Sequence, residues 1–364
     1  MHFAVSLSGE GSGHATRMTA LCLELTARHR VTVFCPNHTR ESMQSTLPDC
    51  RFRDLPGIPT VYRGNGVRML ATVKRNAGTF LRSGWLVREL ARDLGWLRVD
   101  AVVCDYEPFL PRAARLARIP AILFNHQGVV DRHPTPRPAW LVAWLTNRVM
   151  MPPAMARIVS SFYDGDVGPL LRAEIAGRRE PPGDFVVVYA RPGFAEHILP
   201  ALSWFPGTEF RVFPSRQNDF AQSLAACRGA IAPAGHQFTS EALHLRKPLL
   251  AFPQERQYEQ ELNARMLERS GWGIRGCVER AEADVARFLK LLPWFPLRRP
   301  DTGVVFRFHD STGQAVGRIE RIVEGVRSPE RRRPTRRARR VLSPLGPRRA
   351  EPDDGSVSVL GLRG

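Results

Sequence analysis

The chain has 364 residues, of which 43% are hydrophobic, and a formal net charge of +18. This length suits two domains of about 150 residues each. Its longest apolar runs are only as long as strands, well short of the roughly 20 residues of a transmembrane helix, and its start lacks the features of a signal peptide. These properties argue against a membrane-spanning protein and predict a cytoplasmic one.

Apolar runs alternate with helical patterns in the first part of the chain. We expect strands at residues 2–7, 31–35, 101–104 and 121–124, and helices at 15–28 and 109–118. Residues 57–84 are basic, and we expect an irregular segment there, suited to mobile loops near an acceptor. Buried parallel strands linked by helices produce this alternation, so residues 1–165 are predicted to form an α/β Rossmann-like domain.

The pattern restarts after a polar, proline-rich stretch within a predicted linker at residues 166–184. Strands are expected at 185–189, 209–213, 230–232 and 249–252, with helices at 195–202, 239–245 and 258–270, and a final helix within 302–325. Residues 185–325 therefore form the second Rossmann-like domain of the prediction. Two such domains should face a central cleft, because these sheets bind ligands at the carboxyl ends of their strands.

Beyond residue 326 the composition changes to Pro, Arg, Gly and Ser, which predicts a disordered tail over residues 326–364. Residues 327–349 hold ten arginines and a single acidic residue, Glu330. This charge favours peripheral contact with an anionic membrane, such as the inner membrane surface, although a merely solvated tail explains it equally well. Aromatic residues do not alternate with the arginines, so no specific nucleic-acid partner is expected.

A glycine-rich turn, with Gly9, Gly11 and Gly13, separates the first predicted strand from the first helix. Such a turn allows close approach of a ligand, but its spacing departs from the dinucleotide fingerprint, and no acidic residue ends the second strand. The six cysteines are scattered, whereas structural zinc needs ligands at short spacing. We therefore expect neither a nicotinamide cofactor nor a bound metal.

His14 follows this turn at the position from which a side chain would face a ligand. An imidazole can take a proton from a hydroxyl at neutral pH, and a carboxylate behind it would orient the ring. Asp105 ends a neighbouring predicted strand and is the candidate for that carboxylate. The alternative is that His14 only caps or packs the helix, in which case Glu10 and Glu107 are the next candidates.

A second polar cluster leads from the strand at 230–232 into a helix and contains Gly235, His236, Gln237, Thr239, Ser240 and Glu241. Free backbone amides at such a junction suit a phosphate group. Glu241, placed just inside the first turn, either caps its own helix or binds a ribose diol. Glu259 and Gln260 suit sugar hydroxyls, and the alternative for them is an exposed helix face.

Residues 235–263 resemble the donor-binding signature of the UDP-glycosyltransferase superfamily. The matching positions are Gly235, Glu241, Pro248, Glu259, Gln260 and Asn263. The chain is also similar to peptidoglycan N-acetylglucosaminyltransferases of the MurG type. Its Gly-x-Gly-His-x-x-Arg start, at residues 11–17, resembles uncharacterised bacterial and archaeal glycosyltransferase-like proteins. Two positions depart from the pattern, since Pro233 replaces a common His and Phe238 replaces a small hydroxyl residue.

The resemblance implies a GT-B fold and transfer of a hexose-type sugar from a nucleotide diphosphate sugar, with UDP favoured. The acceptor would be a hydroxyl of an unidentified small molecule or lipid, and the transfer would invert the anomeric centre without a metal or cofactor. Glu241 would hold the ribose, Glu259 and Gln260 the sugar, and residues 235–240 the diphosphate. His14 would act as general base with Asp105 behind it.

Two other functions remain open at this point. A nucleotide-sugar 2-epimerase of the same fold would share the donor segment, but it would need no acceptor. A protein that binds nucleic acid or an anionic surface through its basic tail is the other alternative.

Overall fold

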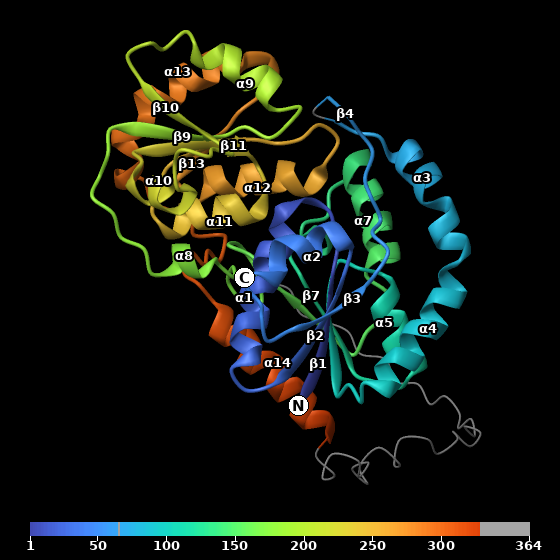
Figure 1. Ribbon diagram of the computed structural model, residues 1–364. Helices are drawn as coiled ribbons and strands as arrows, with labels where there is room; N and C mark the ends of the chain where they lie inside the picture. The colour runs from blue at the N-terminus through green and yellow to red at the C-terminus, as the bar shows by residue number, and fades with distance from the viewer. Residues whose placement is uncertain (65, 328–364) are drawn as a thin grey trace, which may run out of the picture. The chain divides into compact units, whose positions relative to one another are not determined.

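The computed structural model describes residues 1–64 and 66–327 (Figure 1). Residues Met1–Val323 form one compact unit that holds two parallel β-sheets. The predicted α/β class is therefore confirmed. The predicted tail lies outside the described residues except at its start. In the described part of the chain, no helix combines the length and the apolar character that crossing a bilayer requires.

The first sheet has six parallel strands in the order β3-β2-β1-β6-β7-β8. Their bounds are β1 (His2–Leu7), β2 (Arg30–Cys35), β3 (Arg51–Asp54), β6 (Ala101–Asp105), β7 (Ala121–Asn125) and β8 (Ala156–Val159). Alternate residues of each strand enter opposite layers, so that Val5 packs beside α1 (Gly11–Thr26) and Ala4 beside α4 (Ser83–Trp96) and α5 (Phe109–Leu116). Helices thus cover both faces, as buried parallel sheets require.

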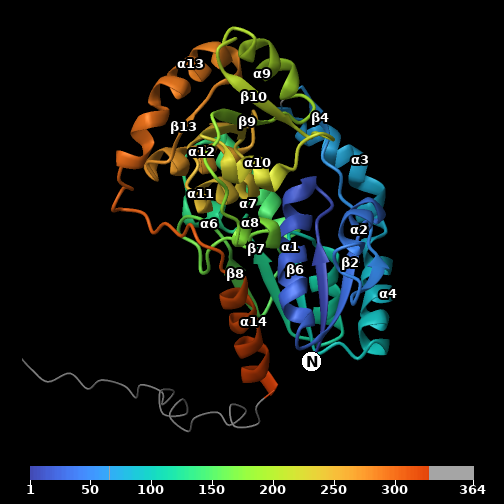
Figure 2. The same ribbon diagram turned by 60° about the vertical axis from the view of Figure 1, so that its left-hand side comes forward.

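The second sheet has five parallel strands in the order β10-β9-β11-β12-β13. Their bounds are β9 (Phe185–Tyr189), β10 (Glu209–Phe213), β11 (Gly229–Pro233), β12 (Leu249–Phe252) and β13 (Gly273–Arg275). One face packs on α10 (Phe220–Ala226), α11 (His236–His244) and α12 (Tyr258–Arg269). The other face packs on α9 (Ala195–Leu202) and α13 (Ala281–Leu291), which Figure 2 shows on the far side of the sheet from α11.

Further elements connect strands within the sheets, lead from one sheet to the other or flank them. They are the helices α2 (Asn37–Gln44), α6 (Val129–Arg132), α7 (Pro138–Met150) and α8 (Ala173–Ala176), and the 3-10 turns Val278–Arg280 and Leu292–Leu297. Side chains from α6 and α7 share one apolar cluster with α10, α11 and α12. The two halves are therefore joined by a common core as well as by the chain.

The expectation of an irregular segment at residues 57–84 was wrong for most of its length. A hairpin of β4 (Tyr62–Arg63) and β5 (Gly66–Val67) leads into α3 (Met69–Leu81), and α4 follows at once. Met69, Val73 and Phe80 recur at helical spacing, but the basic residues between them obscured the pattern. The buried amide of Asn76 fixes α3 by donating to the backbone oxygens of Pro59 and Thr72.

The last helix, α14 (Thr312–Arg327), packs against the first sheet, although it follows the second sheet in sequence. Its buried side chains, Ala315, Val316, Ile319 and Val323, lie in the cluster that α1 forms with the first sheet. The sequence analysis had assigned this helix to the second domain. Helical periodicity identifies an apolar face but does not reveal which of two sheets that face covers.

Replacing Ile319 by Ala should lower the free energy of unfolding by about 2 to 5 kcal/mol, because it leaves a cavity beside the first sheet. The control is Gln314→Ala on the exposed side of the same helix, which should change it by less than about 0.5 kcal/mol. Equilibrium denaturation of both variants measures the difference. Equal stabilities would contradict the docking of α14 on the first core.

Candidate functional site

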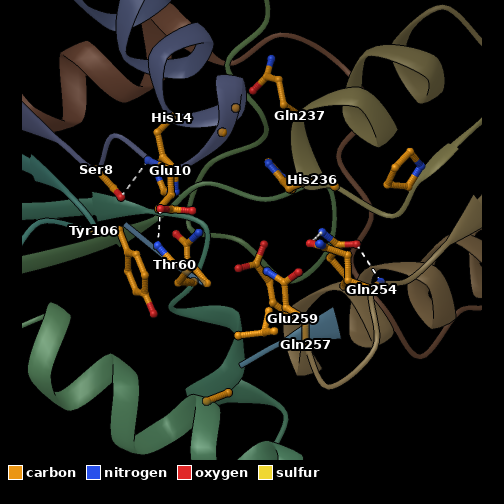
Figure 3. Close-up of a pocket in the computed structure, with 18 of the residues that line it drawn as sticks. Ser8, Glu10, His14, Thr60, Tyr106, His236, Gln237, Gln254, Gln257 and Glu259 are labelled. Carbon is orange, nitrogen blue, oxygen red and sulfur yellow. Dashed lines mark hydrogen bonds between the residues drawn. The ribbon is translucent and has the colours of Figure 1, made fainter. Parts of the chain in front are cut away.

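Residues from both halves line one cavity with a volume of about 660 Å³. Figure 3 shows the side chains of His14 and Glu10 coming from the α1 side of this cavity and those of His236 and Gln237 from the α11 side. The first turns of α1 and α11 contribute to the lining together. The partial positive charge of two helix starts is thus directed at one space, which favours an anionic ligand.

The predicted glycine turn forms the entry to α1. Gly11 has a φ of +67°, a backbone conformation that glycine adopts without strain. A Cβ at Gly13 would meet Gln237 of α11 at 3.6 Å, an ordinary van der Waals contact, so the two helix starts lie close together. Gly9 is not part of the cavity lining; a Cβ there would meet Pro36 at 2.8 Å. The three glycines therefore serve different purposes.

The structure brings His14 and Asp105 together as the sequence predicted. The Nδ1 atom of His14 lies 3.0 Å from Asp105 Oδ2, and His14 lines the cavity. Asp105 is fully buried and lies behind the imidazole. With Nδ1 directed at this carboxylate, Nε2 is the ring nitrogen left for an acceptor hydroxyl. The catalytic role of His14 stays a prediction.

Arg17 is a third member of this cluster that the motif contained but to which the sequence analysis gave no role. Its guanidinium donates to both carboxylate oxygens of Asp105, at 2.9 and 2.7 Å from one nitrogen, and lies 3.2 Å from Nδ1 of His14. Burial alone would raise the pKa of Asp105, but the charges of Arg17 and His14 lower it overall. Asp105 therefore stays ionised inside the protein.

The two alternative carboxylates occupy different environments. Glu107 caps α5 by accepting from the backbone nitrogens of Phe109 and Leu110, and burial raises its pKa to about 6. It does not line the cavity. Glu10 does line it, and its carboxylate accepts from the backbone nitrogen of Thr60 and from the hydroxyl of Tyr62. Glu10 therefore stays a candidate, whereas the contacts of Glu107 are those of a helix cap.

At the start of α11, Gly235, His236 and Gln237 line the cavity, whereas Thr239 and Ser240 do not. The hydroxyls of Thr239 and Ser240 donate to backbone oxygens of the preceding turn, at 2.9 and 2.8 Å. In contrast, the buried Nδ1 of His236 has no partner among the described residues. Of the predicted phosphate-binding segment, the first four residues, Phe238 included, therefore face the ligand space.

Glu241 is placed differently from the prediction. It lies in the second turn of α11, is fully buried and is not part of the cavity lining. Its carboxylate oxygens accept from Arg172 at 2.8 and 2.6 Å, and Gln237 donates to it at 3.0 Å. Arg172 itself lines the cavity. In this conformation a ribose diol would have to displace Arg172 to reach Glu241.

Glu259 and Gln260, at the start of α12, both line the cavity, so the alternative of an exposed helix face is wrong. Burial raises the pKa of Glu259. Gln260 accepts a hydrogen bond from the backbone nitrogen of Gln254 at 3.0 Å. A carboxylate and an amide held in this way can contact the hydroxyls of a sugar.

A buried polar network joins the halves behind the cavity. The ring of His236 stacks on that of His126 at 3.7 Å between centroids, and His126 Nε2 lies 2.9 Å from Asn263 Oδ1. Tyr163 donates to the same oxygen, and Asn263 donates to the backbone oxygen of Ala234. Burial lowers the pKa of His126 to about 3, so this histidine stays neutral. The signature residue Asn263 thus positions the start of α11.

Sequence reasoning missed an aromatic group on the α11 side of the cavity. Tyr189, Phe220 and Phe238 line it with ring centroids 5.7 to 6.2 Å apart, and the Arg172 guanidinium lies 4.7 Å from the Phe220 ring. The position of Tyr189 at the carboxyl end of a strand was a usable signal. No sequence signal distinguished Arg172 from the other residues of the predicted linker.

Comparisons with known proteins agree with this architecture. Residues 1–293 match the family model described as Glycosyl transferase family 1, and the chain belongs to this family. It is thus a glycosyltransferase of the GT-B fold. A protein of Methanosarcina mazei named as an uncharacterized glycosyltransferase is 24% identical over 331 residues, which cover 75% of this chain and 85% of the relative.

Two solved structures share the fold. The glycotransferase of kitacinnamycin is 16% identical with a TM-score of 0.56, over 89% of this chain and 95% of its own. The UGT2 of Phytolacca americana, solved with UDP-2fluoro-glucose and pterostilbene, is also 16% identical, with a TM-score of 0.54, over 89% of this chain and 94% of its own. At these identities the likeness concerns the fold alone.

Arg17→Met should lower the free energy of unfolding at pH 7 by about 3 to 5 kcal/mol, because it leaves the carboxylate of Asp105 buried and uncompensated. The pKa of Asp105 is lowered in the folded protein, so this stabilisation is present above the unfolded pKa of about 4 and is lost as the pH falls through the folded value.

In the variant, burial should raise the pKa of Asp105, so its stability deficit should shrink on acidification. Denaturant unfolding at neutral and mildly acidic pH measures this change. Arg40→Met, which removes an exposed pair with Asp54, is the control and should change stability by less than about 1 kcal/mol. A deficit that does not vary with pH would contradict the proposed charge pairing.

Proposed function

We propose that this glycosyltransferase moves a hexose-type sugar from a nucleotide diphosphate sugar, with UDP favoured, to a hydroxyl acceptor. The observation that supports this most strongly is the convergence of the starts of α1 and α11 on one cavity, with Arg172 and His236 in its lining. A diphosphate is the anion that such a site suits. The partial positive charge of the two helix starts favours such an anion, and we propose a transfer that requires no metal and no cofactor.

On the donor side, we place the diphosphate at the start of α11. The backbone amides after Gly235 supply donors there, and the ring of His236 lines the same part of the cavity. The leaving diphosphate gains negative charge as its bond to the sugar breaks, and fixed donors and a helix start stabilise that charge. Glu259 and Gln260 would hold the sugar hydroxyls, and the aromatic group around Phe220 would contact the nucleotide.

On the acceptor side, His14 Nε2 would take the proton of the acceptor hydroxyl. The acceptor oxygen forms the new bond to the anomeric carbon while the bond from that carbon to the diphosphate oxygen breaks. Attack from the face opposite the leaving group inverts the anomeric centre. Asp105 would hold the ring and stabilise the imidazolium, and the charge of Arg17 on the same carboxylate would moderate that effect.

The preference for UDP rests on two considerations. The donor-side residues Gly235, Glu241, Glu259, Gln260 and Asn263 match the signature of UDP-sugar transferases. A structure of the same fold was solved with UDP-2fluoro-glucose. A thermal-stability screen of UDP-, dTDP- and GDP-sugars tests the proposal, since a ligand at one hundred times its dissociation constant should add about 2.7 kcal/mol. Consumption of the donor without any acceptor would instead indicate an epimerase.

With the donor identified by that screen, His14→Ala should reduce turnover by about a hundred- to ten-thousand-fold at saturating donor. Donor affinity should hardly change, because the proposed donor contacts come from the other half. Steady-state rates and calorimetry separate the two effects. Near wild-type turnover would mean that His14 is structural, and Glu10, the other candidate on this side of the cavity, should then be replaced by Gln.

Glu241→Gln should weaken donor binding by about 1 to 3 kcal/mol if Glu241 leaves Arg172 to bind the ribose, because the amide offers one acceptor fewer. Arg172→Met breaks the same ion pair and keeps the carboxylate, but it also removes a cation from the cavity lining. Calorimetric titration with the nucleotide sugar measures both variants. Unchanged affinity in Glu241→Gln would exclude the ribose contact.

A further inference from the structure

Helix α3 presents its apolar side to solvent. Its polar side faces the protein, where Asn76 is buried and the hydroxyl of Thr72 accepts from the backbone nitrogen of Val61 at 2.9 Å. In contrast, the side chains of Leu70, Val73 and Leu81 are 88%, 60% and 88% exposed. A surface helix of a globular protein normally has the opposite orientation. This arrangement leaves a stripe of large apolar side chains mostly exposed to solvent.

Helix α7 has a similar outward side. Leu141, Leu145 and Val149 recur at helical spacing and are each about half exposed. The inward side of the same helix lines the cavity through Ala143 and Thr146, and α3 lines it through Met69 and Thr72. The six exposed side chains, which we call the α3–α7 surface, are Leu70, Val73, Leu81, Leu141, Leu145 and Val149. This surface therefore consists of the outer sides of two helices whose inner sides line the cavity.

The sequence of α3 and its flanks is basic, since residues 55–88 contain six basic residues and no acidic one. Around α7 the charges are balanced, because Arg132, Arg137 and Arg157 form ion pairs with Asp166, Glu261 and Asp131. Arg68, Lys74 and Arg82 are exposed along and beside α3, which lies at the outer edge of the first half in Figures 1 and 2. Elsewhere on the protein, the exposed aromatic side chain of Trp204 has acidic neighbours, since it lines a pocket together with Glu279 and Glu282.

We propose that the α3–α7 surface binds the surface of an anionic lipid membrane. An amphipathic helix lies in such an interface with its apolar side chains among the acyl chains, and neighbouring basic residues attract the headgroups. Each basic residue close to an anionic membrane adds to the affinity. A soluble protein partner or a second copy of this chain would not require a segment so free of acidic residues.

In this placement the outer sides of α3 and α7 contact the lipid, while their inner sides line the cavity. If the transferase function proposed above holds, the acceptor hydroxyl belongs to a molecule with an apolar part that resides in the membrane. The membrane contact itself does not rest on that function, because it needs neither donor nor acceptor. It is also separate from any contribution of the arginine-rich residues 327–349.

The test uses the full chain with an environment-sensitive fluorophore attached at Leu70→Cys, in a Cys277→Ser background. The other five cysteines are buried. Vesicles of phosphatidylcholine mixed with phosphatidylglycerol should shift the emission to the blue and allow quenching by brominated acyl chains. The same label at Trp204→Cys is the matched control and should show neither change. A label at position 70 that stays in water on vesicle-bound protein would overturn the proposal, whatever the tail contributes.

Co-sedimentation with the same vesicles gives a second measurement. The triple variant Leu70→Ser, Val73→Ser, Leu81→Ser should bind roughly tenfold more weakly or worse, because these side chains no longer enter the apolar layer. Its melting temperature should match that of the wild type, since the three side chains are exposed. Unchanged vesicle binding by the triple variant would contradict the proposal. If the variant instead loses a dimer in sedimentation while its vesicle binding is unchanged, the surface has another role.

Discussion

The site depends on one buried carboxylate. Asp105 ends β6, next to β1, and its partners His14 and Arg17 both belong to α1, which starts directly after β1. The buried charge is tolerated because Arg17 and His14 compensate it. This pairing fixes the orientation of the first turn of α1, and through it the direction of the His14 ring and the approach of Gly13 to α11.

A second polar arrangement controls the other side of the cavity. Asn263, His126 and Tyr163 connect α12 to the first half, while Arg172 connects the segment between the sheets to Glu241 in α11. The donor-side residues are therefore held by contacts that cross between the halves. A ligand that changes the Arg172–Glu241 pair would also act on the segment that joins the two sheets, so donor binding and the relative position of the halves are expected to be coupled.

The sequence was sufficient to predict the two parallel sheets, because buried parallel strands are short continuous apolar runs that stand out between helices. It also predicted that His14 lies beside Asp105 and that Gly235, Glu259 and Gln260 line one cavity. Both predictions follow from the rule that the carboxyl ends of parallel strands share one edge of a sheet. It did not reveal the ion pair of Glu241, because the partner Arg172 lies 69 residues away and carries no local pattern. It failed also for α3, where apolar residues face outward and basic residues interrupt them.

The return of α14 to the first sheet has a consequence for the connectivity of the molecule. The chain passes from the first half to the second after β8 and comes back before α14, so two chain segments link the halves. The first half is therefore built from two separate pieces of sequence, whereas the second half is one continuous piece. A fragment ending after β8 would expose the side of the first core that α14 covers, and a fragment starting before β9 would carry that helix without its partner. Any opening of the cavity therefore has to move two connections at once.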